Sequence, residues 1–178
     1  MKKRVYKHDK VVLKAYDPKV RRYFTKEKAL LIKSLGKGFE LHHVGSTAVA
    51  GLGGKNIPDM LLLAPDKRKA NSAIKVLESI GYKINKSAGD RYRMFFNCNR
   101  KIRGKLMHMH LHLMWKTSNK YKEFLLFRDY LRKHPGEARR YFALKREWTR
   151  KAKMVRRKYT KMKENYIKEV LRKAEEEH

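Results

Sequence analysis

Short apolar runs alternate along this chain with segments whose apolar residues recur at helical spacing. Runs rich in aliphatic and aromatic residues, bounded by glycine, proline or charged residues, predict strands at residues 11–15, 39–44, 59–63, 82–84, 92–97 and 106–115. Apolar residues at every third or fourth position predict helices at residues 17–36, 65–80 and 118–135, and one further stripe through residues 141–170. If that last helix is unbroken, it extends roughly 50 Å at about 1.5 Å per residue.

This order of elements predicts one α/β (α+β) domain with a helical C-terminal extension. The core takes up residues 1–117, of which residues 1–10 form a basic tail, and residues 118–178 form a helical C-terminal extension packed on that core. The chain contains neither an internal repeat nor a linker rich in proline, glycine and serine. We therefore expect a single structural domain, long enough to bury a sizeable core.

The charge of the chain is strongly one-sided. Its 47 lysines and arginines against 17 aspartates and glutamates give a net charge of +30. Because such a surface attracts polyanions, nucleic acid and nucleotides are the expected partners. The alternative is a basic surface without a specific partner, whose charge runs lie on solvated faces.

The compartment is indicated by cysteine content and by the apolar runs. Cys98 is the only cysteine, so no intrachain disulfide can form and an oxidising compartment is not implied. The basic amino terminus lacks the apolar run of a signal peptide. The longest apolar stretch, residues 60–64, is too short to span a bilayer. We expect a soluble cytoplasmic protein without a membrane partner.

Phosphate chemistry is indicated where the strand at 39–44 runs into a glycine-rich segment. Glycine at Gly45 lets the backbone come close to a phosphate, and the turn amides and the Ser46 hydroxyl can donate to phosphate oxygens. Gly45, Ser46 and Thr47 are thus the predicted cradle, and Asp59 across the cleft can hold Mg²⁺. The alternative is a tight turn that needs small residues, with Asp59 accepting backbone hydrogen bonds.

The strand at 106–115 carries a second candidate group of residues. His108, His110 and His112 alternate with apolar residues, so they share one face of the strand at a spacing of roughly 6–7 Å. Imidazoles at this spacing can bind a transition metal or carry protons near neutral pH. The alternative is a polar sheet face covered by a helix, with the histidines hydrogen-bonded to tyrosines or carboxylates.

Further basic residues fall near these candidates or on the C-terminal helix. Arg91 and Arg93, predicted to lie on one strand, and Lys55 in the glycine-rich connection can neutralise phosphate charge, and ordinary solvated side chains are the alternative. The run at 145–163 is dense in lysine and arginine, and its basic face, with Arg150, Arg156 and Arg157, can follow a phosphate backbone. A charged outer helix face is the alternative there.

Nearly the whole chain carries a family pattern. Its most specific part is His43-Val44-Gly45-Ser46-Thr47-Ala48-Val49, then Gly51-Leu52, Lys55 and Asp59. It continues in Tyr16-Asp17-Pro18, Arg91/Arg93-Met94-Phe95-Phe96, His110-Leu111-His112-Leu113, Phe127-Arg128-Asp129-Tyr130-Leu131-Arg132 and His134-Pro135. This pattern resembles the GrpB-like family, a divergent branch of the nucleotidyltransferase-fold superfamily. The resemblance implies a nucleotidyltransferase-like fold, with a mixed sheet flanked by helices.

The chain departs from the catalytic pattern of that superfamily. Catalytic nucleotidyltransferases carry Asp-x-Asp, and here Leu61 stands at the second position. No third carboxylate is evident on a later strand. If the histidine strand lies beside Asp59, as the resembled fold implies, His110 and His112 take the place of that carboxylate.

These observations lead to one functional hypothesis and a rival. We expect a protein that binds a nucleotide or phosphorylated metabolite with a divalent metal (Mg, Mn or Zn), held by Asp59, His110 and His112 as ligands or acid/base groups. If it is catalytic, it transfers a nucleotidyl group to an unidentified acceptor. The rival is a non-catalytic RNA-binding protein that keeps the fold and has lost the carboxylates. We also expect Asp59, His110, His112 and the Gly45-Ser46 turn to converge in one cleft.

Overall fold

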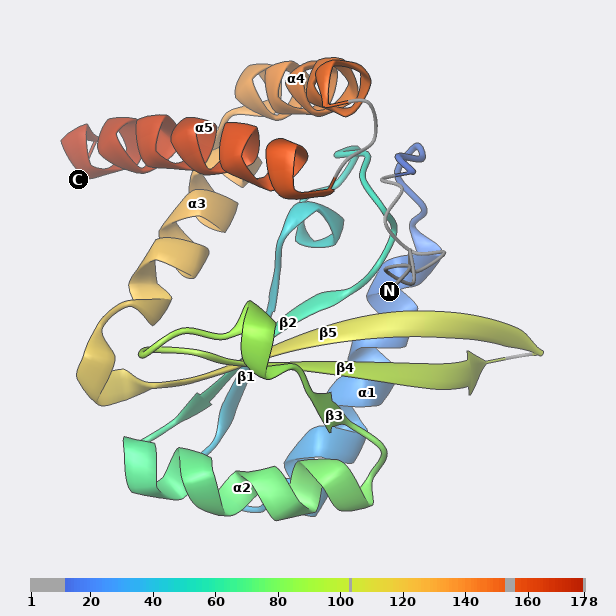
Figure 1. Cartoon of the computed structure of the whole chain (residues 1–178), viewed down its shortest axis with the longest axis vertical. Helices are drawn as coiled ribbons and strands as arrows, with labels where there is room; N and C mark the ends of the chain where they lie inside the picture. The colour runs from blue at the N-terminus through green and yellow to red at the C-terminus, as the bar shows by residue number, and fades with distance from the viewer. Residues whose placement is uncertain (1–11, 103, 153–155, 178) are drawn as a thin grey trace, which may run out of the picture.

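The centre of the molecule is a mixed five-stranded sheet in the order β1-β2-β5-β4-β3 (Figure 1). The structure is a computed structural model that describes residues 12–102, 104–152 and 156–177. The strands are β1 (Glu40–Val44), β2 (Asp59–Ala64), β3 (Lys83–Ile84), β4 (Met94–Ile102) and β5 (Lys105–Trp115). Only β2 and β5 run parallel to each other, and the other neighbouring pairs are antiparallel. The predicted mixed sheet is confirmed.

The pairing of β2 sets the position of its first residue. Asp59 lies beside His110 of β5. On the other side of β2, Asp59 lies opposite Val44, the last residue of β1 before Gly45. Strand pairing therefore brings the end of β1 and the histidines of β5 to the two sides of one carboxylate.

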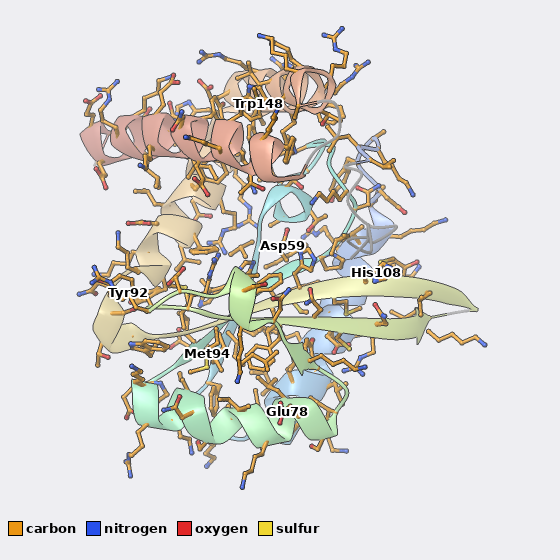
Figure 2. All side chains as sticks on the ribbon, viewed as in Figure 1. Asp59, Glu78, Tyr92, Met94, His108 and Trp148 are labelled. Atoms are coloured by element: carbon orange, nitrogen blue, oxygen red, sulfur yellow. The ribbon has the colours of Figure 1, made fainter. Side chains whose placement is uncertain are left out.

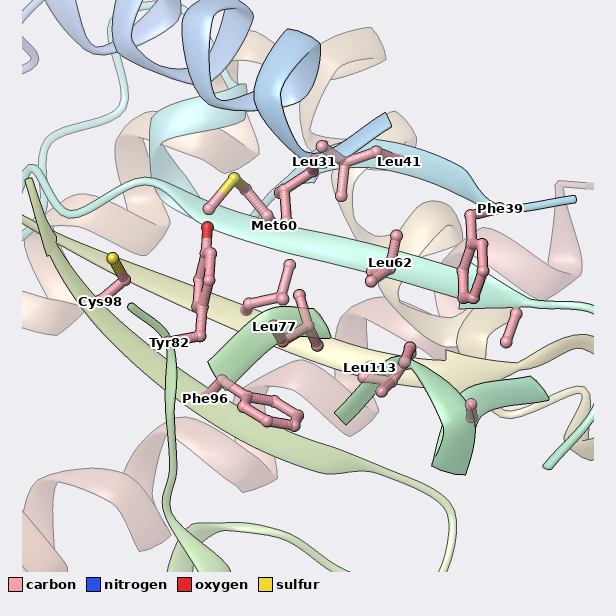
Figure 3. Close-up of a cluster of buried hydrophobic side chains, with 14 of the residues drawn as sticks. Leu31, Phe39, Leu41, Met60, Leu62, Leu77, Tyr82, Phe96, Cys98 and Leu113 are labelled. Atoms are coloured by element: carbon pink, nitrogen blue, oxygen red, sulfur yellow. The ribbon is translucent and has the colours of Figure 1, made fainter. Parts of the chain in front are cut away.

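One face of the sheet is covered by α1 (Lys19–Leu35) and α2 (Lys67–Ser79), which pack on the main core (Figure 3). The strands contribute every second side chain to this core, among them Leu41, Met60, Leu62, Phe96, Met109, Leu111 and Leu113. The start of α2 is fixed by Asp66, whose side chain accepts a hydrogen bond from the Lys69 amide at 2.7 Å. Met109, Leu111 and Leu113 point into the core, as the alternation along this strand predicts.

The other face is covered by the C-terminal helices α3 (Tyr121–Lys133), α4 (Pro135–Lys151) and α5 (Arg156–Glu176) (Figure 1). Phe124 and Leu125 of α3 pack on Leu61 and Met114 of the sheet. Residues of all three helices also pack against the glycine-rich segment. None of the helices in the described ranges combines the length and the apolar character that a membrane span needs.

The predicted long C-terminal helix is wrong. The stripe through residues 141–170 is divided between α4 and α5, which fold back on each other. Their two apolar sides meet where the ring of Tyr141 stacks on the ring of Tyr166, with centroids 4.9 Å apart. Folding back removes both halves of the stripe from water, which an extended helix leaving the domain would not do.

Two strand boundaries also differ from the prediction. Within residues 12–15 the chain forms only one bridge, between Lys14 and Gly54, and residue 11 and the basic tail lie outside the described residues. The strand predicted at 92–97 begins at Met94 and continues through most of the basic segment 99–105. Antiparallel pairing with β5 satisfies the backbone of that segment, so its basic character does not prevent strand formation.

Candidate functional site

The turn after β1 lies directly against Asp59. Gly45 has φ 69° and ψ −169°, a combination essentially restricted to glycine. A side-chain carbon at this position would lie 2.6 Å from Oδ2 of Asp59. Ser46 follows as the first residue of a short 3-10 turn (Ser46–Ala48). Gly45 is therefore required both by the backbone conformation and by the close approach of the turn to the carboxylate.

Asp59 is the centre of a hydrogen-bonded group. Its Oδ1 lies 2.9 Å from Nδ1 of His110 and 3.7 Å from Nε2 of His112. Burial opposes the charge on Asp59, but the two imidazoles outweigh burial and hold the pKa of the carboxyl well below its usual range. Because the carboxylate is ionised, Nδ1 of His110 is the donor. The Nε2 atom of a neutral His110 is then the nitrogen that can accept a proton.

Arg93 orients His112 from the other side. Its Nη1 lies 3.4 Å from Nδ1 of His112. A guanidinium only donates hydrogen bonds, so Nδ1 of His112 accepts and the ring proton is on Nε2, facing Asp59. Burial lowers the pKa of His112, which favours this neutral ring.

Arg93 also has an unused donor. Its Nη2 donates to the carbonyl oxygen of Ala88 at 2.9 Å. Its Nε is buried and has no hydrogen-bond partner among the described residues. Because an unsatisfied buried donor is costly, this nitrogen is a candidate group for binding an anion.

The sequence reasoning missed Lys145, which it placed in the basic run of an outer helix face. Lys145 is 3% exposed, and its Nζ donates to the carbonyl oxygen of Gly53. A side-chain carbon added at Gly54 would lie 2.4 Å from Oγ of Ser46 and 3.5 Å from Nζ of Lys145, so these two groups flank one spot. Lys145 follows Tyr141 by one helical turn, and this position beside the apolar stripe is the signal that pointed to its burial.

These groups line one cavity of about 410 Å³. Figure 2 places Asp59 between the sheet and the C-terminal helices. The polar side of the cavity includes two glutamates, Glu123 and Glu164, beside Gly45, Ser46, Lys55, Asp59, Arg93, His110, His112, Lys145, Thr160 and Lys163. Other parts of the wall are apolar and include Phe95, Phe124, Phe127, Tyr159, Ile167 and Leu171. The cavity therefore offers cationic and hydrogen-bonding groups beside an apolar surface.

Three predicted residues lie outside the cavity lining. Thr47 is buried, and its Oγ1 lies 2.9 Å from Nε2 of His43. Arg91 is exposed in the turn before β4, with its guanidinium over the ring of Tyr92. Arg93 forms an isolated bridge with Asp90 before β4 begins at Met94, so the prediction that both arginines lie on one strand is wrong. His108 is exposed on β5, on the side of Asp59 that leads to the hairpin (Figure 2). Of the three histidines, only His110 and His112 reach the site.

Of the residues predicted to bind nucleic acid, Arg150 is absent from the described lining of this cavity. Arg150 is exposed near the end of α4. Arg156 and Arg157 begin α5, and their side chains lie outside the described part of the structure.

Two arginines of α3 hold the Gly45-Ser46 turn in place through hydrogen bonds to its backbone. Arg128 donates from Nη1 to the carbonyl oxygen of His43 at 3.2 Å, and Arg132 donates from Nε to that of Ala48 at 3.0 Å. Asp129 accepts two hydrogen bonds from Arg128, each at 2.7 Å. The segment Phe127–Arg132, recognised in the sequence as part of a family pattern, thus braces both ends of the Gly45-Ser46 turn.

The predicted divalent metal would find few free ligand atoms among the described residues. Oδ1 of Asp59 is occupied by the proton of His110, and a buried leucine, Leu61, stands in the place of a second carboxylate. Across the described ranges, no group of three or more His, Cys, Asp or Glu side chains is arranged to hold a metal ion. Metal binding by Asp59, His110 and His112 stays a prediction, which calorimetry with Mn²⁺ tests, and the function proposed below does not depend on it.

Comparisons with known proteins show which proteins this chain resembles in sequence and in structure. The family model described as GrpB protein matches residues 10–173. The UPF0157 protein PA4798 of Pseudomonas aeruginosa is 33% identical over 167 residues, covering 93% of this chain and 68% of that protein. The crystal structure of GrpB from Enterococcus faecalis matches with a TM-score of 0.77 and 28% identity, over 92% of this chain and 96% of that one. A structure of the Cid1 poly(U) polymerase matches 67% of this chain and 39% of that chain, with a TM-score of 0.46 and 17% identity. With the match to the family model extending over nearly its full length, this chain belongs to the GrpB family.

Proposed function

We propose that the cavity binds a nucleotide or a related phosphorylated metabolite. The observation that carries this proposal is the convergence of Gly45, Ser46, Arg93 and Lys145 on one cavity. A glycine turn and a hydroxyl suit close approach to phosphate oxygens. Arg93 adds a donor that lacks a partner among the described residues, and Lys145 adds a buried amine. Lys55 and Lys163 on the same wall add positive charge.

The apolar part of the wall supports a nucleotide over a small phosphate alone. Phe124 and Phe127 of α3 and Tyr159 of α5 line the cavity together with aliphatic residues. Aromatic and aliphatic surfaces of this kind bind the flat face of a base. In this proposal the phosphates lie at the Gly45-Ser46 turn, and the base lies against α3 and α5.

For a catalytic version of this function, Asp59 and His110 are the acid/base pair. Asp59 holds the Nδ1 proton of His110, so that Nε2 can take the proton of an acceptor hydroxyl. The acceptor oxygen then forms a bond to the α-phosphorus of a nucleoside triphosphate, and the bond from that phosphorus to pyrophosphate breaks. Ser46 and Lys145 stabilise the charge on the departing phosphates.

A thermal-shift titration tests the binding proposal. At a nucleotide concentration of about 100 times Kd, mass action adds about 2.7 kcal/mol of stability, which raises Tm by roughly 5–10 °C for a chain of this size. Ser46→Ala should reduce the shift because the hydroxyl no longer contacts phosphate. Ser72→Ala on α2, exposed and far from the cavity lining, should keep the full shift. Equal Tm values with and without AMP and ATP in the wild type would reject nucleotide binding.

RNA binding is a second candidate function, favoured by one row of charges on α4. Arg139, Arg146 and Arg150 are all exposed, and none of them forms an ion pair within the described residues. Their spacing of seven and four residues places them on one side of the helix. Free arginines in a row are suited to the phosphates of a nucleic-acid backbone.

A salt titration of fluorescent single-stranded RNA measures this second function. Each neutralised phosphate contributes about 0.7 to the slope of log K against log salt, so changing Arg139, Arg146 and Arg150 to Gln should reduce that slope by about 2. Asp59→Asn should leave the slope unchanged, because Asp59 lies in the cavity and not on this row. If the triple substitution left RNA affinity unchanged, the proposal that RNA binds to this row of arginines on α4 would be rejected.

A further inference from the structure

Lys145 is a buried ionisable group of the cavity that forms no ion pair with a carboxylate among the described residues. Its Nζ donates to the carbonyl oxygen of Gly53 and lies 4.6 Å from the ring centroid of Tyr141 and 5.6 Å from that of Phe142. In the described part of the chain, no Asp or Glu oxygen lies close enough to Lys145 for an ion pair. The amine is therefore surrounded by two rings and one neutral carbonyl, an environment that solvates an ammonium poorly.

The groups facing Lys145 from the surrounding elements add little compensation. Lys163 on α5 and Lys55 in the glycine-rich connection are positive, and Asp59 on β2 is negative but is already bonded to His110. Burial, with a smaller contribution from Lys163, lowers the pKa of Lys145 to about 7, against the opposing pull of Asp59. At pH 8 the free protein therefore holds Lys145 mainly as a neutral amine.

A phosphate bound at the turn would change this balance. Oγ of Ser46 and Nζ of Lys145 flank the same spot, so an anion held by the hydroxyl also lies beside the amine. The two negative charges of the phosphate favour the ammonium strongly, because Lys145 is buried and solvent screens it little. The proton needed to form the ammonium comes from the solvent.

We propose that Lys145 is a proton-coupled anion ligand, which takes up one proton when a phosphate dianion binds beside Ser46. This inference rests on the proposed phosphate site and adds to it that the cleft selects dianionic phosphate groups and binds them more weakly as the pH rises. Without ligand, a neutral amine avoids the cost of a permanent buried charge. With a phosphate bound, the ammonium of Lys145 forms beside the negative charge that compensates it.

Isothermal titration calorimetry with AMP at pH 8 measures this coupling. The phosphate of AMP is a monoester whose second pKa is about 6, so it is already a dianion and exchanges almost no proton itself. The same titration in two buffers of different ionisation enthalpy gives the number of protons taken up. We expect close to one proton per AMP, and an affinity that falls up to tenfold between pH 8 and pH 9.

Two variants assign the proton to Lys145. Lys145→Met fills the same space beside Tyr141 and Phe142 without a titratable group, and it should bind AMP more weakly with no proton uptake. Lys161→Met removes an exposed lysine of α5 that is absent from the cavity lining and should keep both affinity and uptake. AMP binding without proton uptake, or uptake that survives in Lys145→Met, would overturn this inference and leave the proposed function standing. Absence of any AMP binding to the wild type would reject the proposed function, and this inference with it.

Discussion

Replacing Gly45 by alanine should abolish nucleotide binding and lower the free energy of unfolding by about 2–5 kcal/mol. The backbone at φ 69° and ψ −169° strains any residue with a side chain, and the added carbon would meet Oδ2 of Asp59 at 2.6 Å. To relieve that contact, the turn or the carboxylate must move, and either movement changes the position of Ser46 relative to Asp59 in the cavity. Urea unfolding measures the stability change, and the AMP thermal shift measures the binding change.

Gly51→Ala is the matched control for this prediction. Gly51 has a similar φ of 77°, but an added carbon there meets nothing within 4 Å. It should therefore cost only the backbone strain of about 1–2 kcal/mol and leave nucleotide binding intact. If both variants lost the same stability and both still bound AMP, the close approach of the turn to Asp59 would have no part in the site.

The free energy of unfolding should rise with pH between about 7.5 and 9.5, by about 1.4 kcal/mol per pH unit from Lys145 alone. The pKa of Lys145 is lowered from 10.5 to about 7 in the folded protein. Between these two values the unfolded chain carries a proton that the folded chain lacks, so raising the pH favours the folded state. Below pH 7 both states carry the proton, and the full cost of the buried charge is present.

Urea unfolding of the wild type and of Lys145→Met at pH 7.5, 8.5 and 9.5 isolates this contribution. The variant should lose the contribution of Lys145 to the rise of unfolding free energy with pH. Other titrating groups are common to both proteins and cancel in the difference. Burial also raises the pKa of Tyr159 to about 12, but its titration lies above this window. Equal slopes in the two proteins would show that Lys145 is charged throughout, and would contradict the proton-coupled binding as well.

Local patterns in the sequence determined most of the strands and the face of β5 on which its histidines lie. The alternation of histidine with Met109, Leu111 and Leu113 fixed which side of the strand is buried, because side chains point to opposite faces with a period of two. The need for glycine at position 45 was likewise visible, since a strand running into Gly-Ser leads to a turn. These features depend on neighbours in the chain, which the sequence displays directly.

Contacts between distant segments decided which candidates form the site. His108 and His110 have the same local pattern, but only His110 lies beside Asp59, because the parallel register of β2 and β5 selects it. Arg91 and Arg93 are also similar in the sequence, but only Arg93 lines the cavity. The turn before β4 leaves Arg91 exposed and directs Arg93 to His112.

The burial of Lys145 and the break between α4 and α5 depended mainly on tertiary structure. Within its helix Lys145 is one lysine in a basic run, and it is buried only because the glycine-rich segment passes over it with the carbonyl of Gly53. The apolar residues of the stripe through residues 141–170 recur at helical spacing on both sides of the break. Periodicity alone therefore predicts one helix and does not show where the chain reverses direction. The reversal is favoured because it buries the apolar residues of α4 against those of α5. This stabilisation comes from contacts between segments that meet only in the folded chain.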